Sequence, residues 1–316
     1  MFDTVNLILN KYDCNNERGF LCEVPQYLQQ AREITDKETG EIISITSNMN
    51  NLYIKVTDNN VIIKNSLCKY FLGDNMQTLG RGDTKRAIEQ LSDTLHLPIN
   101  KATITAFDFG TNVITECTPN IYFAYLGELS RYKRGLFDRG LYYSSNNITL
   151  AFYDKIKEKQ YRNEKVPELY QGKNVLRYEL RYKQRVKATF KRQDRITAET
   201  LYNEDFYIQI CKNWRNKYIE IQKIHNREIN FDTMRTTKAL RDIAMIKLIQ
   251  DYGAEFLLNV VKERQQLGEI TKKQAYDLRA DINRVIKNQD KIIQSEEKPI
   301  IEELNTKVKN AIKYYR

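Results

Sequence analysis

Histidine is nearly missing from this chain of 316 residues, which contains only His96 and His225. No Cys-x-x-Cys pair accompanies them, so we do not expect a structural zinc site. A metal ion would have to be held mostly by carboxylate oxygens, which favours Mg²⁺ or Mn²⁺ over Zn²⁺. The five cysteines are odd in number and widely scattered. They predict free thiols in a reducing cytosol and exclude a disulfide framework.

Long apolar runs are also missing, since none approaches the ~20 residues that a membrane-spanning helix needs. The first ten residues lack the basic and apolar stretches of a secretory signal. We therefore expect a cytoplasmic protein that does not contact a membrane. With 41% hydrophobic residues the chain can form a sizeable core, and its length suggests about two domains.

Glycine and proline are scarce in the last third of the chain, where only Gly253, Gly268 and Pro299 occur after residue 196. Helical periodicity dominates there, with apolar stripes in Thr236–Arg264 and Thr271–Lys287 and a last helix expected over Pro299–Tyr315. Residues 1–195 instead alternate as strands do, and a helix is expected at Asp83–Leu97. The predicted strands are Thr4–Leu9, Asn51–Thr57, Asn60–Lys64, Ala102–Phe109, Ile148–Lys155 and Val175–Lys183. This change in glycine and proline content and in periodicity predicts two domains, 1–195 and 196–316, with a boundary in Arg192–Glu199.

The net charge of +10 is concentrated in one segment. Residues 131–200 contain 18 Lys and Arg against 8 Asp and Glu, so the rest of the chain is neutral as a set. Ten of the 21 tyrosines lie between Tyr122 and Tyr182. Cations neutralise phosphates and aromatic rings stack on unpaired bases, so we interpret this segment as a nucleic-acid-binding region in preference to a solvated basic surface.

Three strands place polar groups in informative positions. In Ile148–Lys155, alternation puts Tyr153 and Lys155 together on the more open face, although a surface tyrosine is the common alternative.

In Asn174–Lys183, Glu179 lies among Arg177, Arg181 and Lys183. This pattern indicates either a surface ion pair or a cation and phosphate site. In Ala102–Phe109, Asp108 ends an otherwise apolar face, where it could equally cap the following turn or bind a metal.

These pieces, taken in order, resemble the rolling-circle replication initiators of filamentous phages (the gene II/X type) and small plasmids. The resemblance covers roughly residues 3–185. It rests on DTVNLIL near the start, on SLCKYFLGDNMQTLGRGDTKRAIEQLSDTLHL and AFDFGTN, and on GLYYSSNNITLAFYDKIKE followed by NVLRYELRYK. More widespread initiators carry a His-apolar-His pair, which this chain cannot supply, so the match is to the branch without it.

The resemblance implies an α+β fold, in which an antiparallel sheet with packed helices forms a replication-initiator-like nuclease domain and an all-α C-terminal domain follows. It implies an endonuclease that nicks and rejoins DNA in a bacterial host cell through a 5′-phosphotyrosine intermediate and a divalent metal, Mg²⁺ or Mn²⁺. Tyr153 would be the nucleophile, with Tyr143 in reserve because the hairpin register is uncertain by a few residues. Asp108 and Glu179 would bind the metal. Lys155 and Arg177 would neutralise the phosphate.

Single-stranded or hairpin origin DNA is the partner that this resemblance implies, together with a host helicase and polymerase, and a second copy of the chain could form a homodimer. The competing class is a non-enzymatic nucleic-acid-binding protein, either a regulator or a coating protein. Charge alone does not separate DNA from RNA. A tyrosine recombinase is disfavoured by the shortage of histidine.

Overall fold

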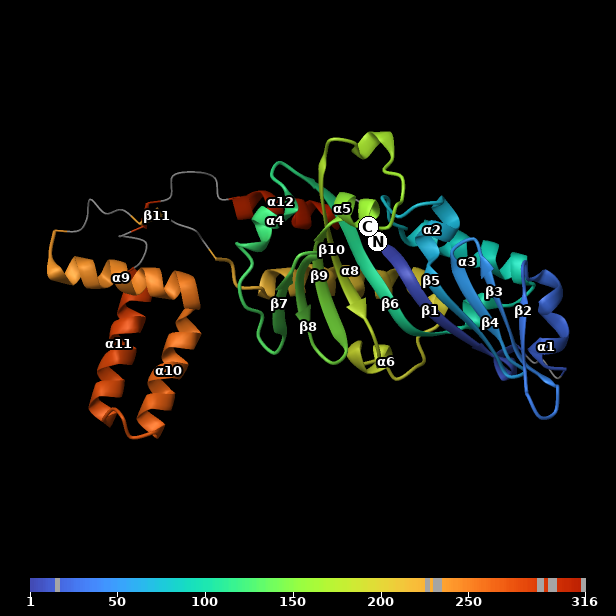
Figure 1. The fold of residues 1–316 in the computed structure, drawn as a ribbon, viewed down its shortest axis with the longest axis horizontal. Helices are drawn as coiled ribbons and strands as arrows, with labels where there is room; N and C mark the ends of the chain where they lie inside the picture. The colour runs from blue at the N-terminus through green and yellow to red at the C-terminus, as the bar shows by residue number, and fades with distance from the viewer. Residues whose placement is uncertain (15–17, 225–227, 230–234, 289–292, 295–299, 314–316) are drawn as a thin grey trace. The chain divides into compact units, whose positions relative to one another are not determined.

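The chain folds into two compact units in the computed structural model, which describes residues 1–14, 18–224, 228–229, 235–288, 293–294 and 300–313 (Figure 1). The first unit contains Met1–Ala124, Glu128–Gln222 and Leu304–Arg316, and the second contains Tyr125–Gly127 and Lys223–Glu303. The first unit thus continues past the predicted boundary at Arg192–Glu199 and includes a further long helix.

A ten-stranded sheet forms the frame of the first unit, and each neighbouring pair of strands is antiparallel (Figure 1). The strand order is β2-β3-β4-β5-β1-β6-β10-β9-β8-β7. Six strands match predicted ones, and four (β2, β3, β7 and β8) were not among them. The bounds are β1 Phe2–Asn10, β2 Arg32–Thr35, β3 Ile42–Met49, β4 Leu52–Val56, β5 Asn60–Ser66, β6 Thr103–Thr115, β7 Lys133–Phe137, β8 Gly140–Ser144, β9 Ile148–Asp154 and β10 Asn174–Tyr182.

Helices connect these strands and cover the sheet, which confirms the predicted α+β class. They are α1 Phe20–Glu23, α2 Leu67–Leu72, α3 Arg81–Leu95, α4 Pro119–Phe123, α5 Lys155–Tyr161, α6 Val186–Thr189, α7 Ala198–Tyr202 and α8 Glu204–Glu220. Short 3-10 turns lie at Lys11–Cys14, Pro25–Tyr27, Ile99–Lys101 and Glu168–Tyr170. The predicted helix Asp83–Leu97 corresponds to α3.

Aromatic rings pack one face of β9 and β10 against α8. Alternation puts Leu176, Tyr178 and Leu180 on this face. The Tyr178 ring stacks on Phe152 at 4.4 Å, and its hydroxyl donates to the Trp214 carbonyl oxygen at 3.0 Å. This face is therefore core, and polar chemistry has to lie on the other face.

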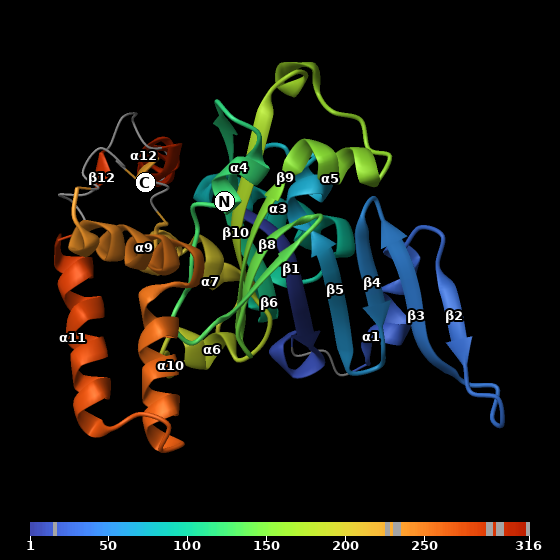
Figure 2. The same cartoon turned by 60° about the vertical axis from the view of Figure 1, so that its left-hand side comes forward.

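The second unit is helical, as predicted (Figure 2). Its helices are α9 Thr237–Tyr252, α10 Ala254–Gln266 and α11 Lys272–Asn288. Strands β11 Glu228–Ile229 and β12 Ile293–Gln294 form a small second sheet. Helix α12 spans Ile300–Ala311 and belongs to the first unit from Leu304 onward. The stripe predicted over Thr236–Arg264 is divided at Gly253, whose φ of 85° ends α9. Val261, Ala275 and Ile282 form a buried cluster, but Leu240, Leu248 and Phe256 of the predicted stripe are exposed.

The ends of the predicted last helix, Pro299 and Tyr315, and His225 lie outside the described residues. All five cysteines are free thiols, as expected. Within the described part of the chain, no helix combines the length and apolar character required to cross a bilayer.

Candidate active site

Cross-strand pairing brings the predicted site residues to one face of the sheet. Arg177 of β10 pairs with Tyr153 of β9, and Arg181 pairs with Asp108 of β6. Glu179 lies between the two arginines on β10 and faces the same way, because side chains two residues apart share a face. Three neighbouring strands therefore gather a phenol, two carboxylates and two guanidinium groups.

Glu179 is held by both arginines. The Nε atom of Arg177 donates to one carboxylate oxygen at 2.8 Å, and that of Arg181 donates to the other at 2.7 Å. Burial opposes ionisation of Glu179, but the two guanidinium groups outweigh it and hold the pKa of Glu179 below its usual range. Glu179 is thus a fixed negative charge at neutral pH.

Tyr153 has only 7% of its surface exposed, and its hydroxyl donates to Glu179 Oε2 at 3.4 Å. Burial raises the pKa of Tyr153 well above its ordinary value, and the Glu179 charge adds to the rise. The phenol is therefore neutral in the resting protein. The expectation of a more open face is wrong, since Thr149 and Ala151 beside it are buried as well.

An extra residue in β1 adds a third carboxylate. Phe2 pairs with Phe109 and Val5 with Phe107, so both Asp3 and Thr4 lie opposite Asp108 in a β-bulge. Asp3 Oδ2 accepts from Arg177 Nη2 at 2.8 Å. The same oxygen accepts from Asn75 Nδ2 at 3.1 Å, and the Ser66 hydroxyl donates to Oδ1 of Asp3.

These groups enclose a cavity of about 420 Å³. Its walls come from β1, β5, α2, β6, β9, α5 and β10. The lining residues are Asp3, Thr4, Asn51, Asn65, Ser66, Lys69, Asn75, Asp108, Tyr153, Glu158, Arg162, Glu179 and Arg181. The predicted nucleophile and both predicted metal ligands therefore share one cavity.

Asp108 is the carboxylate best suited to bind a cation. Burial and the nearby Glu179 charge raise the pKa of Asp108 to about 7, which a bound cation would reverse. Among the described residues, no three His, Cys, Asp or Glu side chains form a ready metal cluster. Mg²⁺ is often held by one or two carboxylates together with water and substrate phosphates. Asn75 adds a buried amide oxygen, Oδ1, that has no hydrogen-bond partner in the structure.

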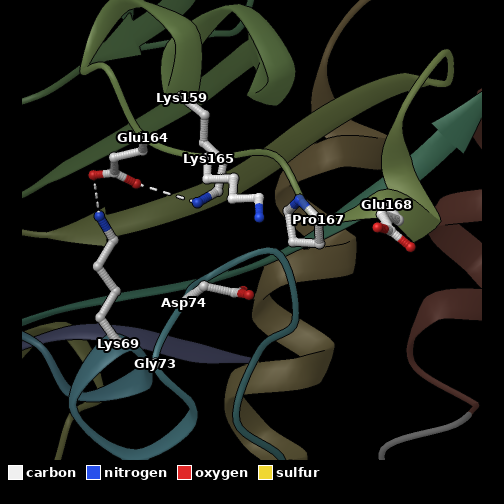
Figure 3. Close-up of a pocket in the computed structure, with 8 residues that line it drawn as sticks. All are labelled: Lys69, Gly73, Asp74, Lys159, Glu164, Lys165, Pro167 and Glu168. Atoms are coloured by element: carbon white, nitrogen blue, oxygen red, sulfur yellow. Dashed lines mark hydrogen bonds and ion pairs between the residues drawn. The ribbon is translucent and has the colours of Figure 1, made fainter.

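Figure 3 shows a second cavity, of about 660 Å³. Lys69 lines both cavities. Glu164 bridges Lys69 and Lys159, and the bond to Lys159 measures 3.2 Å. Three lysines and three acidic residues line this cavity, namely Lys69, Lys159, Lys165, Asp74, Glu164 and Glu168. The charges balance, so this cavity offers little attraction for a phosphate.

A family model described as the N-terminal region of the gene II replication-associated protein of phages matches residues 1–217. The chain belongs to this family. It is thus a replication initiator of the filamentous-phage gene II type, which confirms the resemblance seen in the sequence. The match spans the ten-stranded sheet and nearly all of α8. A search of curated proteins finds no match.

Two residues that the resemblance assigned to the phosphate are enclosed in this family member. Arg177 is 0% exposed, and its guanidinium group contacts Asp3, Glu179 and Asn112. Lys155 begins α5 instead of continuing β9, and its Nζ pairs with Glu158 at 2.8 Å. Burial lowers the pKa of Lys155. Both residues support the site from within, whereas Arg181 is partly exposed and lines the cavity.

Tyr143, the reserve nucleophile, lies on the other face of the sheet. It pairs with Leu150, which pairs with Leu180 in the core, and its ring packs edge-on against Phe152 at 6.2 Å. Burial raises the pKa of Tyr143 beyond its usual range. The register thus separates the two tyrosines, and Tyr142, which pairs with Ala151, shares the face of Tyr153.

Sequence reasoning missed Asp3 and Asn75 as members of the site. Asp3 carries the signal that singled out Asp108, because alternation puts this carboxylate at the end of a face that is otherwise apolar, with Val5, Leu7 and Leu9. The bulge that turns Asp3 inward has no such signal. Asn75 lies in the loop between α2 and α3, where Asn112 Nδ2 donates to its backbone carbonyl oxygen at 3.3 Å. Its side chain lines the cavity.

Proposed function

We propose that this replication initiator nicks and rejoins one DNA strand at an origin through a covalent bond between Tyr153 and a 5′-phosphate. The observation that carries the proposal is the cavity shared by the Tyr153 hydroxyl, Asp108 and Glu179. A nucleophile hydrogen-bonded to a fixed carboxylate, beside a second carboxylate of raised pKa, is an arrangement that suits metal-assisted phosphoryl transfer.

The reaction exchanges one phosphodiester for another. The Tyr153 oxygen attacks phosphorus, the bond from phosphorus to the 3′-oxygen breaks, and the phenol proton is transferred to the freed 3′-oxygen. Neither water nor an external energy source is consumed, so the reverse reaction rejoins the strand. The guanidinium carbon of Arg181 lies 6.0 Å from the centre of the Tyr153 ring. The guanidinium group would face the negative charge that develops on the phosphate.

Asp108 would hold Mg²⁺ or Mn²⁺, with Glu179 and the free amide oxygen of Asn75 close by. The bound ion would polarise the phosphate and lower the barrier to attack. Because both oxygens of Glu179 already accept hydrogen bonds from arginine, Asp108 carries the larger share of this role. A host helicase, a polymerase and a second copy of the chain stay predictions as partners.

The test is a denaturation-resistant protein–DNA adduct. The protein is incubated with a labelled single-stranded origin oligonucleotide and Mg²⁺ or Mn²⁺, then separated under denaturing conditions. We expect Tyr153→Phe to form no adduct. Tyr143→Phe, the same chemical change on the opposite face, should form as much adduct as wild type.

Variants of Asp108 test the metal site in the same adduct assay. Asp108→Ala should lower adduct yield strongly, and Asp108→Glu should recover part of it with Mn²⁺. Adduct formation by Tyr153→Phe would refute the nucleophile, and unchanged metal dependence in Asp108→Ala would refute the metal site. Strong single-strand binding without an adduct under either ion would favour the competing class, a DNA-binding protein without chemistry.

A further inference from the structure

The hairpin of β7 and β8 carries aromatic rings on the same sheet face as Tyr153. Tyr142 of β8 pairs with Ala151 of β9, which in turn pairs with Glu179. Gly135 of β7 pairs with Tyr142, and Phe137 lies two residues further along the same strand. All these positions therefore point to one face. Phe137 is 65% exposed although it is a large apolar ring at the end of a strand.

Glycine at position 135 makes room for that ring. A Cβ atom at Gly135 would lie 2.7 Å from Cε2 of Phe137, a distance that real contacts do not reach. The absence of a side chain lets the Phe137 ring lie back over β7, where its centroid is 5.9 Å from that of Tyr142. The ring is thus held by its own strand while most of its surface stays open.

Arg181 connects this aromatic pair to the cavity. Its guanidinium carbon lies 5.8 Å from the Tyr142 ring centre and 6.0 Å from that of Tyr153, while its Nε bonds to Glu179. One cation thus borders both the candidate nucleophile and the exposed rings. A continuous row runs from Tyr153 through Arg181 and Tyr142 to Phe137.

A pair of an arginine and an aromatic ring lies at the turn between β7 and β8, at the end of the sheet where β9 is followed by α5. The Arg139 guanidinium lies 4.1 Å from the ring centre of Tyr161, which is 71% exposed at the end of α5. The next residue, Arg162, lines the cavity. α5 therefore leads from the cavity wall to the hairpin turn.

We propose that Phe137, Tyr142 and the Arg139–Tyr161 pair form a stacking platform for unpaired bases of the DNA strand next to the scissile phosphate. The proposal rests on the proposed function, because it places that phosphate at Tyr153. Exposed rings stack on any base, and adjacent arginines attract the phosphates between the bases. The platform lies within the segment that holds the whole excess of positive charge, 18 basic against 8 acidic residues over 131–200.

The test measures binding of a short fluorescein-labelled single-stranded DNA by anisotropy, with every variant made in the Tyr153→Phe background so that no covalent step interferes. Phe137→Ala removes one stacking ring, so its Kd for this DNA should be roughly 10-fold higher than that of the Tyr153→Phe parent. Phe137→Trp should restore binding. Tyr12→Ala is the matched control, because Tyr12 is 79% exposed and also lies beside a cation, Lys11 at 5.8 Å, but follows the far end of β1. This control should bind like the parent.

A strand with abasic sites in place of its bases separates stacking from charge. The difference between Phe137→Ala and its parent should vanish on the abasic strand. An equal difference on both strands, or unchanged binding by Phe137→Ala and Tyr161→Ala, would overturn the platform. Because β7 is an edge strand, light scattering is run in parallel. A change in mass with no change in DNA binding would mean that the surface covers a second copy, and this too would overturn the proposal.

The outcome is independent of the nicking assay. Adduct formation by wild type together with unchanged DNA binding by Phe137→Ala would refute the platform alone. Weaker binding by Phe137→Ala with no adduct from wild type would refute the nicking reaction and leave a single-strand-binding platform.

Discussion

The two faces of β10 are both buried, but different forces stabilise them. On one face Tyr178 stacks on Phe152 and packs against Trp214 of α8. On the other, Arg177 and Glu179 are buried and neutralise each other. An apolar face gains from each ring independently, whereas a buried ionic face is stable only while its members are all present. The charged face is therefore the more fragile one, and it is the face that carries the site.

Removal of Arg177 should have the largest effect on stability. Arg177→Met leaves the carboxylates of Asp3 and Glu179 buried without their shared partner. We expect the free energy of unfolding in urea to fall by about 3–5 kcal/mol. The triple variant Arg177→Met, Glu179→Leu, Asp3→Leu removes the charges together and should recover most of that loss. A loss below about 1 kcal/mol in the single variant would contradict the ionic description of this face.

A substitution at Gly110 tests whether the site requires the close approach of β6 to β10 at Glu179. A Cβ atom at this position would lie 2.6 Å from the Glu179 Cα and closer still to its Cβ. Gly110→Ala should therefore shift Glu179, lower the unfolding free energy by about 1–3 kcal/mol and reduce adduct yield.

Gly82→Ala is the control, because Gly82 lies in α3 with nothing within 4 Å of the added Cβ. It should raise the unfolding free energy by about 0.5–1 kcal/mol. Equal effects of the two substitutions would show that the close approach does not matter.

The pH dependence of stability should separate the two carboxylates. The pKa of Asp108 is raised to about 7, so the folded protein holds a proton that the unfolded chain releases near pH 4. The Asp108 contribution to stability therefore falls as pH rises between those values and is level above them. Glu179, whose pKa is lowered, contributes stability that is lost as pH falls below its unfolded pKa.

Urea unfolding at a series of pH values checks this prediction without metal. Asp108→Asn should gain stability relative to wild type as pH rises from about 4 to 7, and Glu179→Gln should lose it as pH rises through the acidic range. Parallel curves for Asp108→Asn and wild type would contradict the raised pKa.

Period-two alternation in the sequence predicted the strands that matter most and put Glu179 and Arg177 on one face of β10. The family resemblance, and not alternation, assigned Asp108 and Tyr153 to one site, and the two residues line the same cavity. Alternation could not locate Asp3, because a β-bulge breaks the alternation on which the reasoning depends. It misjudged Lys155, because the Asp154 side chain caps α5 and ends the strand one residue early.

Exposure was the other quantity that alternation could not supply. Alternation predicts that a polar residue on a strand faces an open surface, but Arg177 has no exposed surface. The exposure of such a residue depends on partners that are distant in the sequence. Buried Arg177 pairs with Asp3, which is 174 positions away in the chain. The choice between Tyr153 and Tyr143 likewise required the register of β8 on β9.

The most direct test of the proposed nicking reaction is to identify the amino acid that carries the DNA. The adduct formed with Mg²⁺ or Mn²⁺ is digested with protease and nuclease, and the nucleotide-bearing peptide is sequenced by mass spectrometry. We predict a single modified residue, Tyr153, in the peptide that continues into α5. A nucleotide on Tyr143, on Tyr142 or outside β9 would contradict it.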